Sequence, residues 1–134
     1  MAILSTSTIC DFASTRGNLL SIINGGISRI YVNAVPSILP IYVALVVEFE
    51  DLEISLPHEI TISIDGLEAN TATGSTAFQV LEEDLKLEVS EKLLVPFAIP
   101  LVGLPIKEYG KHIIKIYVDD EFMRELAFWV IKPQ

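Results

Sequence analysis

The alternation of apolar and polar residues over residues 109–130 constrains the fold of this chain more than any other feature of its sequence. Successive side chains of a β-strand point to opposite faces, so a period of two on both sides of a short acidic tip predicts a β-hairpin. β-Branched and aromatic side chains pack well on a pleated surface, and this hairpin is rich in both. We expect the other strands to assemble around it. Its alternating apolar residues are Ile114, Ile116, Val118, Leu126, Phe128 and Val130.

Earlier segments show related patterns. Residues 3–14 are rich in Ser and Thr and predict an edge strand. Residues 41–49 are apolar at nearly every position, which is typical of a strand covered on both faces and therefore central in its sheet. Residues 60–64 alternate as a half-buried strand does. We predict an all-β fold in one domain spanning residues 1–134: a two-layer antiparallel β-sandwich, immunoglobulin-like, with about 7 to 9 strands.

Two glycine-containing sites mark changes of direction. Gly17 and Asn18 both tolerate positive φ, as a tight turn requires. Asn24, Gly25 and Gly26 interrupt an otherwise extended segment. They could form a hairpin turn, or a bulge that bends one long strand across the edge of the sandwich, which we favour. Because strand-like residues follow Gly26, this is not the strand-to-helix context of a phosphate-binding loop.

Composition and the N-terminal sequence indicate in which cellular compartment the protein is expected. A chain of 134 residues can bury roughly two thirds of its unfolded surface without a covalent staple. Its single cysteine, Cys10, forms no internal disulfide and fits a reducing compartment. Residues 1–13 lack the basic start and continuous apolar core of a signal peptide. We therefore expect a cytoplasmic location.

The chain is more apolar than is usual for a soluble protein with 20% charged residues, since 51% of its residues are hydrophobic and its mean hydropathy is +0.50. Its longest apolar runs, residues 41–47 and 93–106, are shorter than the ~18 residues of a membrane span, and the second contains three prolines. We therefore expect no membrane association. The apolar surplus is expected in strands buried on both faces or in a contact between subunits.

Acidic residues are concentrated in one part of the chain. The net charge is −9, and residues 30–85 contain ten acidic residues and no Lys or Arg. An acidic surface repels phosphate backbones and anionic lipid headgroups, which argues against nucleic acid and membrane partners. The simpler interpretation is that these carboxylates keep an apolar protein in solution.

Both ends of the chain resemble a known family. Residues 10–13 read Cys-Asp-Phe-Ala, residues 17–32 hold the glycine turn and the Gly-Gly kink, and the terminal hairpin has the acidic tip Asp119-Asp120-Glu121. In this combination the chain resembles an uncharacterised family of small bacterial proteins. The resemblance implies a β-sandwich and brings no assigned activity.

Residues 93–106 are the segment most difficult to place. Prolines cannot donate to a sheet ladder, so we expect an edge strand or an extended crossover. An exposed apolar edge favours association. The segment either packs as core under the terminal hairpin or contributes to a subunit or partner interface. The candidate interface residues are Leu94, Phe97, Ile99, Leu101, Val102 and Leu104.

Catalytic signals are sparse. His58 and His112 have no Cys, Asp or Glu at metal-ligand spacing, and isolated imidazoles are more often solvent-facing loop residues. No Gly-x-Ser-x-Gly elbow nominates a nucleophile. Cys10 lies within an apolar strand, which is typical of an inert small hydrophobe. We therefore expect no enzyme activity and no cofactor.

Acidic residues in predicted turns suggest a calcium-binding site as a hypothesis. The spacing of these residues is unspecific, and ordinary solvated turns are the simpler interpretation. The residues concerned are Asp65, Glu68, Asp119, Asp120 and Glu121.

Two functional hypotheses follow. The first is a non-enzymatic module that binds itself or a partner protein through an apolar edge. The alternative is a small hydrolase or ligand-binding sandwich whose site is assembled from dispersed residues such as His58, His112 and Asp119.

Overall fold

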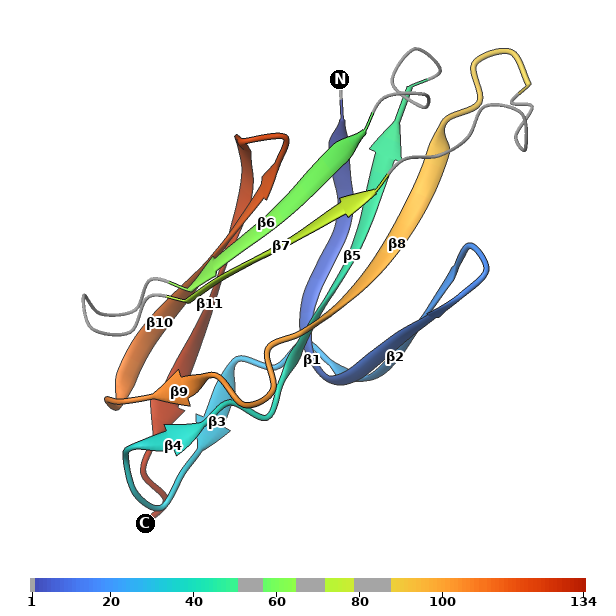
Figure 1. The fold of residues 1–134 in the computed structure, drawn as a ribbon. Coiled ribbons are helices and arrows are strands. Elements are labelled where there is room, and N and C mark those ends of the chain that lie inside the picture. Colours follow the sequence, from blue (N-terminus) through green and yellow to red (C-terminus); the bar gives the residue numbers. More distant parts are fainter. Residues whose placement is uncertain (1, 51–56, 65–71, 79–87) are drawn as a thin grey trace.

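The structure is a computed structural model that describes residues 2–50, 57–64, 72–78 and 88–134, and it shows an all-β fold (Figure 1). The described residues form eleven strands and no helix. Eight strands have seven residues or more, and the other three have two or three, so the predicted β-sandwich is confirmed. The strands are β1 (Ile3–Arg16), β2 (Leu19–Gly25), β3 (Arg29–Tyr31), β4 (Ser37–Ile38), β5 (Tyr42–Phe49), β6 (His58–Ile64), β7 (Ala72–Phe78), β8 (Leu93–Pro100), β9 (Pro105–Ile106), β10 (Gly110–Val118) and β11 (Glu121–Ile131).

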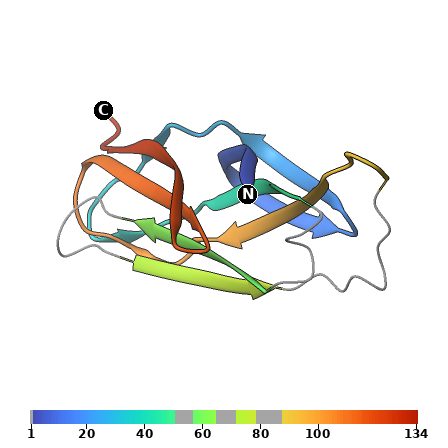
Figure 2. The same cartoon turned by 90° about the horizontal axis from the view of Figure 1, so that it is seen from above.

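Two sheets form the layers of the sandwich. Sheet A has the order β2-β1-β5-β8, and sheet B has the order β3-β11-β10-β6-β7. Strands β4 and β9 form a separate short ribbon. The described strand pairs are antiparallel except β3 with β11, which run parallel. Sheet A curls strongly, so that its two edge strands, β2 and β8, approach each other (Figure 2).

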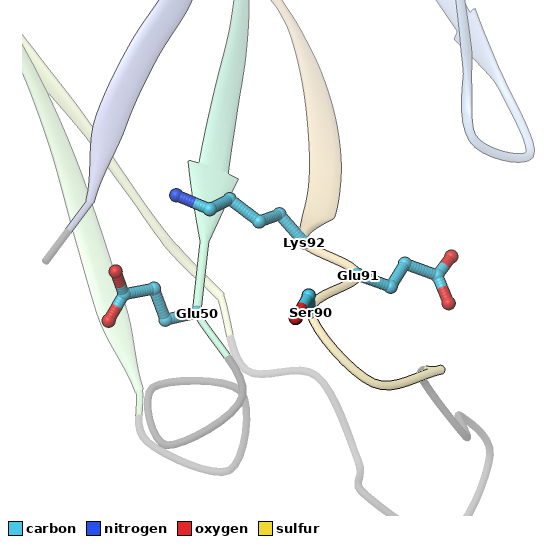
Figure 3. A pocket seen from close by; sticks show the side chains of 4 residues that line it. All are labelled: Glu50, Ser90, Glu91 and Lys92. Atoms are coloured by element: carbon cyan, nitrogen blue, oxygen red, sulfur yellow. The ribbon is translucent and has the colours of Figure 1, made fainter.

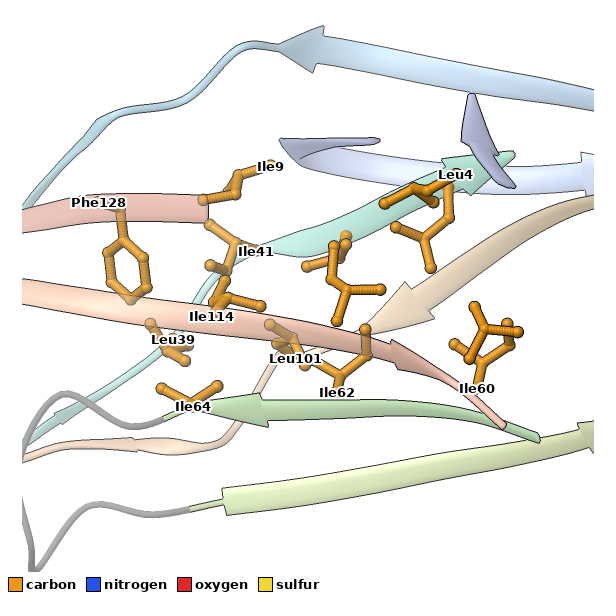
Figure 4. Close-up of a cluster of buried hydrophobic side chains, with 14 of the residues drawn as sticks. Leu4, Ile9, Leu39, Ile41, Ile60, Ile62, Ile64, Leu101, Ile114 and Phe128 are labelled. Carbon is orange, nitrogen blue, oxygen red and sulfur yellow. The ribbon is translucent and has the colours of Figure 1, made fainter. Parts of the chain in front are cut away.

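The core lies between the two sheets and follows the alternation in the sequence. In β5, every second side chain from Val43 to Phe49 is buried and faces sheet B. In sheet B, β6 and β10 contribute a layer of isoleucines that are at most 4% exposed (Figure 4). Burying one such side chain contributes about 1.5–3 kcal/mol, so the alternation stabilises the sandwich as well as setting its register. The buried isoleucines are Ile60, Ile62, Ile64, Ile114 and Ile116.

The predicted terminal hairpin is confirmed as β10 and β11, which pair from Gly110↔Val130 to Val118↔Glu121. Asp119 and Asp120 form its two-residue turn, with φ of 51° and 65°. Positive φ at both central residues defines a type I′ turn, whose twist matches that of the flanking strands. Aspartate tolerates this conformation better than most residues, so the turn forms without glycine.

Strand β1 is not the edge strand expected from its Ser and Thr content. Its first half pairs with β5, from Ile3↔Glu48 to Cys10↔Tyr42, and its second half pairs with β2, from Cys10↔Gly25 to Arg16↔Leu19. The polar side chains fit an interior strand because their alternation leaves one face of the sheet toward solvent.

The chain changes sheets at the Gly-Gly kink. Strand β2 ends at Gly25 in sheet A, Asn24 and Gly26 adopt φ of 51° and 82°, and β3 then joins the edge of sheet B. The kink is therefore not a hairpin turn. It carries the chain across the edge of the sandwich, as the favoured interpretation of the sequence required, but as a break between two strands and not as a bulge within one.

Candidate functional site

The six candidate interface residues do not share one exposed face. Leu101 is 4% exposed and belongs to the main core. Phe97, Ile99 and Leu104 are half-buried and pack against that core. Leu101 therefore lies in the core, and the other three residues contact the core with part of their surface. Only the remaining two are exposed, and they are Leu94 at 50% and Val102 at 52%.

Strand β8 is the edge strand that its prolines predicted, and those prolines restrict further pairing. The β5–β8 ladder continues through Pro96 and Pro100. Backbone groups two or four positions apart point to the same side of a strand, so both prolines place their missing N–H on the free side. This edge therefore has few donors for another strand.

The other edge of sheet A lies on a hairpin arm, residues 11–25, formed by the second half of β1 and by β2. Gly17 (φ 60°) and Asn18 form its two-residue turn, and the glycine at the first central position is typical of a type II′ turn. In Figure 2, β2 (light blue) lies at the upper right of the molecule and β7 (yellow-green) along its lower border. The arm thus lies on the side of sheet A away from sheet B.

One side of the arm covers a second, smaller core. Cys10 and Ala44 are fully buried there and Ala13 is 3% exposed, with Leu20 of β2 packed against them. Burial raises the pKa of the Cys10 thiol, whose Sγ donates to the Tyr42 carbonyl at 3.7 Å. A buried thiol with a raised pKa is unreactive, in agreement with its predicted role as a small hydrophobe.

The remaining apolar side chains of the arm face solvent. Leu19 is 74% exposed, Ile23 55%, Phe12 43% and Ile22 39%. Strand β2 contains no charged residue and no proline, and among the described strands it pairs with β1 alone. The predicted interface lay in residues 93–106 and did not include this edge. The signal was available, since residues 19–23 are apolar on both faces beside a tight turn.

The structure brings together two of the three residues of the hydrolase hypothesis. The Nδ1 atom of His58 lies 2.7 Å from Oδ2 of Asp119, and the backbone N–H of Glu59 donates to Oδ1 of the same carboxylate at 2.8 Å. The His58 ring also packs on Phe49, with 4.4 Å between ring centroids. His58 is 6% exposed, so it is not the solvent-facing residue expected from the sequence.

His112 is also buried, at 3% exposure. Its Nε2 lies 3.0 Å from the Glu108 carbonyl oxygen, and its ring stacks on Phe128 at 5.3 Å. It lies near the start of β10, whereas Asp119 follows the end of that strand, so His58 and His112 lie at opposite ends of β10. The prediction of solvent-facing histidines is wrong, because each ring packs on a phenylalanine. Each ring nitrogen also has a polar partner, the Asp119 carboxylate for His58 and the Glu108 carbonyl for His112.

An open depression of about 310 Å³ lies at one end of sheet A and is lined by Glu50, Ser90, Glu91 and Lys92 (Figure 3). The Glu91 carboxylate accepts a hydrogen bond from the Glu88 N–H at 2.8 Å and points away from Glu50. Neither histidine lines this depression. The described side chains that line it are all exposed.

The calcium hypothesis gains no support from the described residues. They contain no group of three or more His, Cys, Asp or Glu residues placed to hold a metal ion. The Asp119 carboxylate is engaged by His58 and Glu59. Asp65 and Glu68 lie outside the described residues.

Fold and site together define a small all-β sandwich that has a contact between a buried histidine and a partly exposed aspartate, and an exposed apolar edge strand. The sequence matches the model of a family of unknown function, DUF6941, over residues 5–131, and the chain therefore belongs to that family. No curated protein and no solved structure matches it. In the described part of the chain, no helix is long and apolar enough to cross a membrane.

Proposed function

We propose that this chain is a non-enzymatic protein-interaction module that binds itself or a partner protein through the free edge of β2. The observation that carries the proposal is the exposure of Leu19, Ile22 and Ile23 on an uncharged, proline-free edge strand. Such an edge presents unpaired backbone groups and apolar side chains together, which are the two elements of β-strand addition.

Natural edge strands usually carry charges, prolines or bulges that discourage pairing. Strand β8 follows this rule with its two prolines, and β2 does not. Exposed apolar residues occur singly on most protein surfaces, but here four of them lie on one hairpin arm. The contrast between the two edges of one sheet favours a binding role for β2.

The test compares Leu19→Asp with Val89→Asp. Val89 is 97% exposed and lies outside the arm, so its variant controls for added charge on an apolar surface residue. We expect Leu19→Asp to abolish self-association in light scattering, and capture of partner proteins from native extracts, with an unchanged melting temperature. We expect Val89→Asp to behave as the unmodified protein. Equal behaviour of the two variants would refute the proposal.

The alternative function, a small hydrolase or ligand-binding sandwich, is favoured by the 2.7 Å His58–Asp119 contact alone. The His58 side chain is 5% exposed, so a substrate would have to displace its neighbours to reach the ring. Hydrolysis of model esters that disappears in Asp119→Asn while the fold persists would favour this function over the interaction module.

A further inference from the structure

We propose that the partner of the β2 edge is a second copy of this chain, paired antiparallel about a two-fold axis at Ser21. The inference rests on the proposed function and specifies its partner. Its starting point is the order of side chains in residues 19–23, Leu-Leu-Ser-Ile-Ile, which is symmetric in character about the central serine.

The hairpin turn determines which backbone groups of β2 are available. Arg16 and Leu19 flank a two-residue turn, and such residues form a hydrogen-bonded pair. Pairing alternates along the ladder, so Leu19, Ser21 and Ile23 direct their N–H and C=O groups toward β1. Leu20 and Ile22 therefore direct theirs toward the free edge.

A two-fold axis at Ser21 lets the free backbone N–H and C=O groups of Leu20 and Ile22 form hydrogen bonds with the second copy. It places Leu20 opposite Ile22 of the second copy and Ile22 opposite its Leu20, which gives about four backbone hydrogen bonds between the strands. The same register places Leu19 opposite Ile23 of the second copy. Apolar side chains thus meet apolar side chains on both faces, and such cross-strand pairs stabilise the pairing of the two strands.

The charge of β2 is compatible with a second copy, and the size of the contact predicts a weak association. The chain carries a net charge of −9, but β2 is uncharged and residues 1–29 contain one acidic and two basic residues, so this part of the sequence adds no net negative charge to the contact. A pairing of five residues buries less than the about 800 Å² per partner of a standard interface. We therefore expect a dimer that dissociates on dilution, in which two four-stranded sheets become continuous.

Cysteine cross-linking tests the register in a Cys10→Ala background, which removes the native thiol. At the axis, Ser21 and its copy form a non-hydrogen-bonded pair with Cα atoms about 4.5 Å apart, within reach of a disulfide. Leu19 and its copy are about 14 Å apart, beyond that reach. We expect Ser21→Cys to form a covalent dimer under mild oxidation and Leu19→Cys not to. A mixture of Leu19→Cys and Ile23→Cys chains should cross-link only between unlike chains.

Proline substitution tests the edge itself. Ile22→Pro removes an N–H that faces the free edge and leaves the β1–β2 ladder intact, because proline is tolerated on an edge strand. We expect light scattering of this variant to give the mass of one chain at concentrations where the unmodified protein has twice that mass. An unchanged melting temperature shows that the hairpin persists.

The outcomes separate the two proposals. A dimer that Ile22→Pro leaves intact, or in which Leu19→Cys cross-links as readily as Ser21→Cys, overturns the Ser21-centred pairing. A monomer at every concentration overturns the second copy as partner, and the interaction module then depends on the capture comparison of Leu19→Asp with Val89→Asp.

Discussion

Replacing Asp119 by alanine should destabilise the protein more than any other change in the exposed turns described above. The substitution removes the acceptor of two contacts, at 2.7 Å from His58 Nδ1 and 2.8 Å from the Glu59 N–H. Leaving the buried imidazole without this partner costs about 1–3 kcal/mol. Alanine in the left-handed conformation, at φ 51°, costs about 1 kcal/mol more. The expected loss is about 2–4 kcal/mol, with the lower half favoured because the Asp119 side chain is 44% exposed.

The assay is urea unfolding of Asp119→Ala beside Asp120→Ala. Asp120 has φ 65° in the same turn, so its variant measures the conformational cost alone. The difference between the two free energies of unfolding gives the contribution of the carboxylate contacts, and it should exceed about 1 kcal/mol. Asp119→Asn should fall between them, because asparagine tolerates this φ and its amide oxygen still accepts from Glu59. Equal losses for the two alanine variants would refute a stabilising role for the His58 contact.

Three further predictions concern the buried residues. Because its pKa is raised, the Cys10 thiol should react with a thiol reagent at neutral pH only after denaturant is added, and a native thiol that reacts at once would contradict this prediction. The folded state favours the protonated thiol, so the free energy of unfolding should decline as pH rises above about 9. Leu101→Ala should lower the free energy of unfolding by about 2–4 kcal/mol and Val102→Ala by less than about 0.5 kcal/mol, as measured by urea titration; similar losses would place Leu101 outside the core. Ala44→Leu should overfill the second core and cost about 1–3 kcal/mol, whereas a fully stable variant in a thermal melt would show that the arm moves aside freely.

The alternation of apolar and polar residues and the residue types in the turns were sufficient to predict much of the fold. The β10–β11 hairpin, the central position of β5 and the change of direction at Gly26 all follow from local residue order. The interior position of β1 does not, because it depends on a partner strand more than thirty residues away. Strand β7 shows the same limit: the sequence of residues 72–76 is small and polar without alternation, and pairing with β6 is what makes this segment a strand.

The candidate site was less predictable than the fold. Nothing in the residues around His58 indicates the carboxylate of Asp119, since the two meet only when β6 and β10 pair. The apolar surplus was recognised from composition, yet its location depends on which strand covers which face. Alternation within β8 turns Phe97 and Ile99 inward, and the exposed apolar edge belongs to β2 instead.

The parallel pairing of β3 with β11 has a consequence for how the molecule folds. It sets Arg29 beside Trp129, so the two residues close a loop that contains most of the chain. Closing such a loop is entropically unfavourable before the intervening contacts form, and all-β domains rich in distant contacts fold in about milliseconds to seconds. Strand β11 also lies between β3 and β10, so its release would open sheet B from the edge inward. We therefore expect the two layers to unfold in one cooperative transition, with neither end of the chain fraying independently far into its sheet.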